Sequence, residues 1–237
     1  MKILYFFYQY LIGLPLLILS TIITCTFIVL CYPWKNSKAP HAMQVLWGKC
    51  VFWSLLIPLK VTGGEKLDPN KSYVFVSNHQ SLFDIFAIYI AVPNKFKWLV
   101  KKELKKVPFI GWACSAGGHI FVDRTNPRAA LQSLERIKSE LVDGISTAIF
   151  PEGTRTKNGE VGRFKRGAFQ IAVDLNLPVV PISVSGLYEA MPSHTYYVKP
   201  GSKVSVHVGD PVNLSDFESR DEAIKYLHEQ VKQHVKH

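Results

Sequence analysis

The sequence predicts an α/β protein: a mixed, largely parallel sheet flanked by helices, preceded by an N-terminal membrane-associated helical segment. Two observations lead to this prediction. The chain from Ile3 to Trp34 contains no charged residue. After about residue 61, short runs rich in Val and aromatic residues alternate with helix-like stretches, as in helices packed on a parallel or mixed sheet. We therefore expect N-terminal helices over 1–60 and one α/β domain over 61–237.

The first apolar run is long enough to cross a bilayer. As a helix it would measure about 48 Å, against a hydrocarbon core of about 30 Å. Gly13 and Pro15 predict a kink or a break near its start, and both a spanning and a re-entrant path remain open. Lys35 and Lys38 directly follow the run, which favours a cytoplasmic location for the domain after it. A cleaved signal peptide is disfavoured because the run is too long.

A second, weaker apolar stretch covers Val45–Pro58 and includes Lys49. It suits either a helix lying at the membrane interface or a buried helix.

The sheet is predicted from short runs rich in Val and aromatic residues or alternating in polarity, each followed by turn residues. These strands are expected over 72–78, 96–102, 119–124, 146–152, 178–186 and 203–209.

The helices between the strands are predicted from apolar spacing and from capping residues. One is expected over 81–91 and another over 164–176. Asn126 followed by proline suits a helix start, and Gly144 a helix end. Ser219 with Glu222 forms a capping box for a terminal helix. The apolar face of that helix would comprise Ala223, Ile224, Leu227, Val231 and Val235.

The charge and the cysteines narrow the choice of partners. The formal net charge of +10 indicates an anionic partner. Lys95–Trp112 contains six lysines and one glutamate among aromatic residues, a pattern that suits single-stranded nucleic acid or an anionic membrane surface. Next to an apolar anchor, the membrane surface is favoured and no nucleic-acid partner is expected.

No C-x-x-C pair is present, so we expect neither disulfides nor a zinc site.

Polar residues break the apolar pattern where predicted strands end, which is where open α/β sheets bind ligands. His79 follows one strand, and Asp84 stands five residues later. Five helical residues turn through about 500°, so the two side chains cannot share a helix face. If they meet, His79 lies in the turn before the helix and Asp84 reaches back. Such a pair serves proton transfer, whereas an unlinked turn histidine and helix-start acid is the simpler interpretation.

A second cluster follows the strand over 146–152. In "FPEGTRT", Pro and Gly bend the chain and expose Glu152, Thr154 and Arg155. Arginine and hydroxyl donors suit phosphate oxygens. Lys165 and Arg166 add cations at the start of the next predicted helix, and helix starts attract anions. A solvated turn with a Glu152–Arg155 surface pair is the alternative.

Taken together, four motifs resemble the glycerolipid acyltransferases of the 1-acyl-sn-glycerol-3-phosphate acyltransferase type. They are "NHQSLFD", "GGHIFVDR", "FPEGTRT" and "VPISVSG", in family order over about residues 60–190. The resemblance implies His79 as general base and Asp84 as its partner. It implies acceptor binding by Arg124, Glu152, Gly153, Thr154 and Arg155. Candidates for supporting the site are Asn78, Lys102, Lys165, Arg166 and Pro181.

The reaction implied by the resemblance moves an acyl chain from acyl-CoA or acyl-carrier protein to the sn-2 hydroxyl of lysophosphatidic acid, giving phosphatidic acid. A thioester has a good leaving group, so we expect no metal and no cofactor beyond the acyl donor, which is a co-substrate. Two alternatives remain open: the same chemistry on glycerol 3-phosphate or another lysophospholipid, and a non-catalytic protein that binds anionic lipid.

Overall fold

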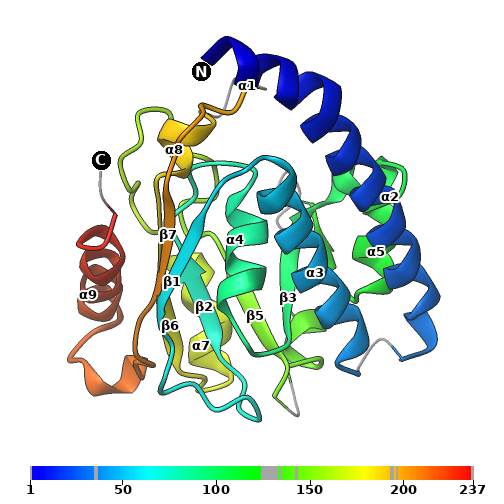
Figure 1. Ribbon diagram of the computed structural model, residues 1–237. Coiled ribbons are helices and arrows are strands. Elements are labelled where there is room, and N and C mark those ends of the chain that lie inside the picture. Colours follow the sequence, from blue (N-terminus) through cyan, green and yellow to red (C-terminus); the bar gives the residue numbers. More distant parts are fainter. Residues whose placement is uncertain are drawn as a thin grey trace.

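A computed structural model of the chain describes residues 2–34, 37–123, 133, 135–141, 144–192, 195 and 197–235. It contains a seven-stranded sheet in the order β1-β7-β6-β2-β5-β3-β4, with helices on both faces (Figure 1). The strands are β1 (Leu59–Gly63), β2 (Val74–Ser77), β3 (Phe96–Lys101), β4 (Ile120–Val122), β5 (Ser146–Ile149), β6 (Val179–Ser185) and β7 (Val204–Val208).

The sheet is mixed and largely parallel, as predicted. Every neighbouring pair of named strands is parallel except β6 and β7, which are antiparallel. The carboxyl ends of β2, β5 and β6 therefore meet at one end of the sheet, together with the first residues of β7 and β1. This end contains the candidate site.

The described helices begin with α1 (Lys2–Tyr8), the π-helical turn η1 (Gln9–Gly13), α2 (Leu14–Leu30), η2 (Tyr32–Trp34) and α3 (Ala39–Ser54). Within the domain they are α4 (Asp84–Ala91), η3 (Lys102–Lys106), α5 (Ile110–Ala116), η4 (Arg166–Phe169), α7 (Gln170–Asp174), α8 (Leu187–Ala190), η5 (Leu214–Asp216) and α9 (Arg220–Lys232).

The N-terminal apolar run forms one continuous helix over Lys2–Leu30. The interruption predicted at Gly13 and Pro15 takes the form of the π-helical turn η1, after which α2 continues. A side chain at Gly13 would lie 2.8 Å from the carbonyl oxygen of Ser54, so glycine lets this turn approach the end of α3. The resulting helix, Lys2–Leu30, is 29 residues long and by length and composition suffices to cross a membrane.

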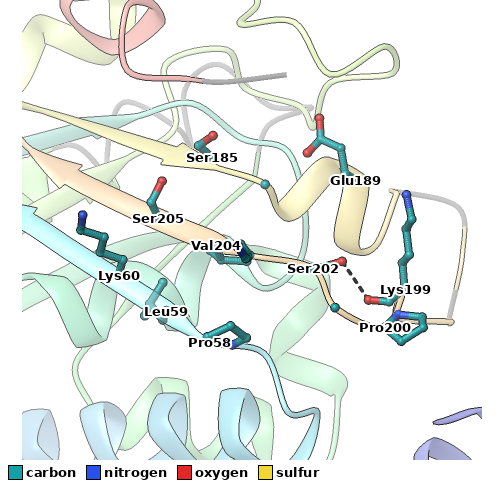
Figure 2. Close-up of a pocket in the computed structure, with 13 residues that line it drawn as sticks. Pro58, Leu59, Lys60, Ser185, Glu189, Lys199, Pro200, Ser202, Val204 and Ser205 are labelled. Carbon is teal, nitrogen blue, oxygen red and sulfur yellow. Dashed lines mark hydrogen bonds between the residues drawn. The ribbon is translucent and has the colours of Figure 1, made fainter. Parts of the chain in front are cut away.

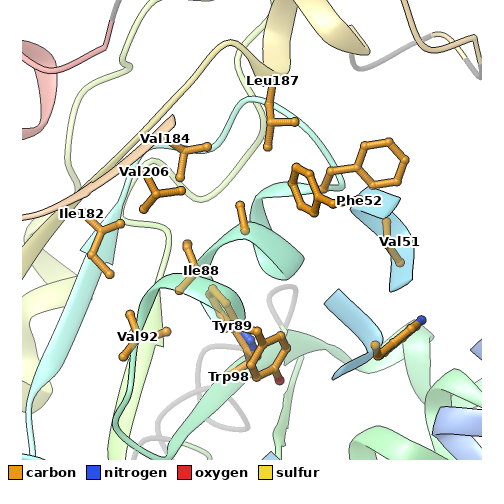
Figure 3. Packing of buried hydrophobic residues seen from close by; sticks show 14 of the residues in the cluster. Val51, Phe52, Ile88, Tyr89, Val92, Trp98, Ile182, Val184, Leu187 and Val206 are labelled. Atoms are coloured by element: carbon orange, nitrogen blue, oxygen red, sulfur yellow. The ribbon is translucent and has the colours of Figure 1, made fainter. Parts of the chain in front are cut away.

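Two apolar clusters form the core, one on each face of the sheet. On one face α4 packs against β6 and β7, with Ile88 near Ile182 and Val206 (Figure 3). Helix α3 packs on α4, and its Phe52 lies beside Leu187. On the other face α7 and α9 cover Val74, Val76 and Val179. The residues predicted for the apolar face of the terminal helix, namely Ala223, Ile224, Leu227, Val231 and Val235, are all buried. The capping interaction forms as well, since the Glu222 amide donates to Ser219 Oγ at 3.2 Å.

The structure departs from the predicted elements in several places, and α5 and α8 were not predicted. The helix expected over 81–91 begins only at Asp84, because the amides of Gln80 and Ser81 turn to the Asp84 carboxylate. The helix expected over 164–176 is split into η4 and α7. Strand β1 was not predicted, and it places Leu59 and Lys60 in the sheet rather than in the N-terminal part. The start of the helix predicted after Asn126 lies outside the described residues.

Candidate active site

His79 and Asp84 are in contact, in the arrangement that helix geometry allows for such a contact. His79 lies in the turn between β2 and α4, and its Nδ1 is 2.8 Å from Asp84 Oδ2. The same carboxylate oxygen accepts the amide hydrogens of Gln80 at 2.6 Å and Ser81 at 2.9 Å. The Asp84 side chain is fully buried, whereas the His79 side chain is 17% exposed. Asp84 thus fixes both the turn and the imidazole, and the imidazole remains accessible to a ligand.

Two rings stack behind this imidazole. The His79 and Phe150 rings lie 3.9 Å apart with planes inclined by 8°, and Trp98 stacks on the far side of Phe150 at 5.0 Å. Sequence analysis did not single out Phe150, because the residue before a Pro-Gly turn reads simply as the end of an apolar strand.

Glu152 joins three segments of the site. Its Oε1 accepts the His79 amide hydrogen at 2.8 Å, and its Oε2 accepts that of Gly162 at 3.0 Å. Burial raises the pKa of the Glu152 carboxyl, and the hydrogen bonds from these two amides oppose that rise. The resemblance implies a role for Glu152 in acceptor binding. In the structure both of its oxygens are engaged by the main chain, so its observed role is to hold the loop against His79.

The remaining residues of "EGTR" form an exposed turn. Gly153 has φ +79°, and a Cβ on it would lie 2.8 Å from Lys165 Nζ, so the Lys165 ammonium lies against this turn. Thr154 and Arg155 are exposed. Thr156 anchors the turn, since its amide donates to the His79 carbonyl at 2.8 Å. Among the described residues, Arg155 takes part in no ion pair and can meet an anion.

An apolar cavity of about 650 Å³ lies between the N-terminal helix and the domain. Leu14 and Leu17 line it from α2, and Leu82 and Phe83 from the turn that follows His79. Arg155 is the one charged side chain among its described lining residues. A ligand with an apolar chain and an anionic head would therefore find both kinds of contact next to His79.

The other predicted residues have structural partners. Asn78 exchanges two hydrogen bonds of 2.8 Å with the Val184 main chain and so links β2 to β6. Lys102 pairs with Asp123, and Arg166 pairs with Asp221 of α9 at 2.8 Å.

Pro181 and Arg124 complete the predicted set. Pro181 lies in the middle of β6 against Gly209, and it lines a different cavity from Arg155. Arg124 lies outside the described residues.

The chemistry open to this constellation is proton transfer beside an exposed arginine. An imidazole that donates Nδ1–H to a carboxylate presents Nε2 as a proton acceptor. Ser81 is fully buried and its hydroxyl donates to the Met191 carbonyl at 3.2 Å, so it is not placed as a nucleophile. Among the described residues, no group of three or more His, Cys, Asp or Glu side chains is arranged to hold a metal ion.

Comparisons with known proteins agree on one family. A family model described as "Acyltransferase" matches residues 58–185. A 1-acyl-sn-glycerol-3-phosphate acyltransferase of Chlamydomonas reinhardtii is 32% identical over 214 residues, which are 89% of this chain and 63% of the relative. The chain thus spans less than two thirds of that relative's length. One from Limnanthes douglasii is 30% identical over 205 residues, covering 85% of this chain and 72% of the relative.

A solved structure has the same fold. The crystal structure of the 1-acyl-sn-glycerophosphate (LPA) acyltransferase from Thermotoga maritima superposes with a TM-score of 0.81 at 29% identity. The match covers 98% of this chain and 93% of that one, so the likeness extends over the N-terminal helices as well as the sheet.

Proposed function

This chain belongs to the acyltransferase family, and from that membership we propose that it acylates the sn-2 hydroxyl of 1-acyl-sn-glycerol 3-phosphate. The product is phosphatidic acid, and the donor is a thioester, acyl-CoA or acyl-carrier protein. The observation that supports this most directly is the accessible His79 imidazole. It is bonded to buried Asp84 and lies beside an apolar cavity with Arg155 at its edge.

The proposed reaction needs one base and no metal or cofactor. His79 Nε2 takes the proton of the sn-2 hydroxyl as the oxygen attacks the thioester carbonyl carbon, and Asp84 stabilises the resulting imidazolium. The tetrahedral intermediate then collapses, the carbon–sulfur bond breaks, and the imidazolium returns its proton to the departing thiolate. The products are the new ester and the free thiol.

The acceptor is assigned from the two kinds of contact beside His79. Arg155 offers a planar fork for the phosphate. Thr154 on the same turn and Lys165, whose ammonium lies against that turn, supply further donors. The cavity of about 650 Å³ would take the acyl chain that lysophosphatidic acid already carries. Glycerol 3-phosphate lacks such a chain, which makes lysophosphatidic acid the favoured acceptor.

The N-terminal helix supports a membrane location. Apolar side chains along it are exposed, among them Leu11, Leu19 and Phe27, and a lipid acceptor and product reside in the bilayer. We place the domain on the cytoplasmic side, at an anionic membrane surface, because of the lysines that follow the apolar run.

The deciding experiment is an assay of the purified protein with several acceptors and both donors. Lysophosphatidic acid is expected to be the preferred acceptor, ahead of glycerol 3-phosphate and other lysophospholipids. His79→Ala is expected to abolish transfer. Turnover of the variant at a near wild-type rate would remove His79 as the base, and a preference for another acceptor would overturn the substrate assignment.

A further inference from the structure

A second hollow, of about 620 Å³, opens at the same end of the sheet as His79. It lies where β6 ends and β7 and β1 begin (Figure 2). Its described lining contains three lysines, Lys60, Lys199 and Lys203, and one acid, Glu189. The hollow is therefore cationic overall.

The floor of the hollow is a row of polar side chains set by strand register. Lys60 of β1 pairs with Ser205 of β7, and Ser205 pairs in turn with Ser185 of β6. Residues in register on adjacent strands project from the same face of a sheet. Figure 2 shows Lys60, Ser205 and Ser185 rising from neighbouring strands on one side, with Lys199 at the opposite end of the hollow. An ammonium group and two hydroxyls therefore lie in one line.

The three lysines are not held in ion pairs within the described residues. No ion pair within the described part of the chain involves Lys60, Lys199 or Lys203. A comparably sized basic cavity is lined by Arg163, Arg166 and Lys225, and one of these cations, Arg166, is paired with Asp221. Unpaired ammonium groups beside hydroxyl donors suit phosphate oxygens.

The hollow and the acceptor turn flank His79 on opposite sides. Glu152–Arg155 follow β5 on one side of β2, whereas β6, β7 and β1 follow one another on the other side. At about 4.8 Å per strand, β7 and β1 stand about 10 and 14 Å from β2. The small helix α8 touches both regions: Tyr188 donates to Lys157 O at 2.9 Å near the active-site turn, and Glu189 lines the hollow.

We propose that this hollow binds the phosphate groups of the acyl donor, a thioester of phosphorylated pantetheine. The inference rests on the proposed acyl transfer. A pantetheine arm has two amide units, and at peptide bond lengths and angles it extends about 15 Å from sulfur to its first phosphate. The row projects from the α9 face of the sheet, as Ser183 does, whereas Asp84 and Phe150 hold His79 from the α4 face. An arm of this length starting at His79 would reach the row by crossing the carboxyl end of β6. The acceptor phosphate occupies the other flank, at Arg155.

The test uses three donors that share one acyl chain and differ in phosphate content. Acyl-pantetheine carries no phosphate, acyl-phosphopantetheine carries one phosphomonoester, and acyl-CoA carries a diphosphate and a further phosphate. Lys60→Gln and Lys203→Gln are each expected to raise the donor KM about fivefold for the two phosphorylated donors, the upper range for an exposed ion pair. The KM for acyl-pantetheine and the KM for the acceptor are expected to stay at the wild-type values.

Lys225→Gln is the matched control, because it removes the same charge from the other basic cavity. It is expected to leave all three donor KM values unchanged. The proposal is overturned if Lys60→Gln and Lys203→Gln leave every donor KM unchanged, or if they raise all three equally. It is also overturned if Lys225→Gln alone gives the phosphate-dependent penalty. Weaker binding of the lysine variants to phosphatidylglycerol vesicles at unchanged donor KM would assign the hollow to the membrane surface instead.

Direct binding separates this proposal from the proposed function. Calorimetry with free CoA measures binding at the hollow without any turnover. We expect the Kd of CoA to be about fivefold higher for Lys60→Gln than for the wild type. If Lys60→Gln weakens CoA binding but the wild-type protein makes no phosphatidic acid, the acceptor assignment is wrong and the donor-site proposal is retained. If phosphatidic acid forms while Lys60→Gln and Lys203→Gln bind CoA as tightly as the wild type, the donor-site proposal is wrong and the proposed function is retained.

Discussion

The imidazole of His79 lies flat on the phenyl ring of Phe150, with ring centroids 3.9 Å apart and planes inclined by 8°. The bond from Nδ1 to Asp84 fixes the ring edge, and the Phe150 face fixes its plane. Together they determine where Nε2 points. Phe150 is therefore a positioning residue for the proposed base.

Phe150→Leu removes the flat surface and keeps an apolar side chain. We expect kcat to fall about tenfold with little change in either KM, because a ring free to tilt spends less time in the geometry for proton transfer. Steady-state kinetics with both substrates measure this split. Phe150→Tyr keeps the stacked face and is the control that should retain activity. A raised KM at unchanged kcat would show instead that Phe150 shapes a substrate pocket.

Asp84→Asn tests the orientation of the imidazole. The carboxylate accepts from His79 Nδ1 and from two main-chain amides through one oxygen. An asparagine can present an N–H where the imidazole needs an acceptor. We expect kcat to fall by about 10³–10⁴-fold, as for other histidines that lose an orienting carboxylate, with only a modest change in KM.

Ser81→Ala is the neighbouring control for Asp84→Asn. The Ser81 hydroxyl contacts the Met191 carbonyl in the protein interior. Activity within a few-fold of wild type is expected. Complete loss of activity in a folded Ser81→Ala protein would point to a serine nucleophile and contradict the proposed mechanism.

Glu152→Gln tests the link between the two loops. The variant keeps one acceptor oxygen and brings an NH₂ group toward either the His79 or the Gly162 amide. A buried amide without its acceptor costs about 1–3 kcal/mol, although removal of a buried charge offsets part of that cost. We expect a lower melting temperature and a lower kcat together. An unchanged melting temperature with a raised acceptor KM would instead support direct acceptor binding by Glu152.

Arg155→Ala should weaken use of the acceptor. Hydrogen bonds to charged groups contribute about 1.5–3 kcal/mol, so an acceptor KM raised by about tenfold or more is expected, at unchanged donor KM. Arg163→Ala removes the same charge from a nearby exposed position and is the matched control. Equal kinetics for wild type and Arg155→Ala would remove Arg155 from the site.

Buried His119 predicts a pH dependence of stability. Burial lowers its pKa to about 3, and nearby Lys97 and His41 contribute in the same direction. The Trp98 amide donates to His119 Nδ1 at 3.2 Å, which requires the neutral ring. Below the unfolded value of about 6.5, the unfolded chain binds the proton and the folded one does not. This contribution to stability is therefore complete above that pH and is lost as the pH falls toward 3.

Urea unfolding of the detergent-solubilised protein measures this effect. Between about pH 6 and pH 4 the free energy of unfolding should fall by up to about 1.4 kcal/mol per pH unit from this residue alone. In His119→Asn an amide oxygen can replace Nδ1 as the acceptor for Trp98. For that variant the free energy of unfolding should depend on pH less steeply, by about 1.4 kcal/mol per pH unit, which corresponds to one proton. An equal pH dependence in both proteins would contradict the assignment.

The sequence by itself determined most of the strands and where His79 and Asp84 would lie if they met. Strand periodicity and capping residues are local signals, so β2, β5, β6, β7 and α9 were predictable. Helix geometry predicted the placement of His79 before the helix if the two side chains met, and the resemblance to a family implied that they do. The family motifs implied the other candidate members of the site by resemblance.

Only the tertiary structure decided which of those residues gather at His79. Arg166 forms an ion pair with Asp221 of α9. Pro181 is in the middle of β6 and lines a different cavity from Arg155. Phe150, the bridging carboxylate of Glu152 and the row of Lys60, Ser205 and Ser185 had no sequence signal. Each depends on strand order or on contacts between segments far apart in the chain. Local sequence patterns do not predict which distant segments come into contact. The sequence therefore determines the kind of chemistry available, and the packing of the sheet determines which side chains can take part.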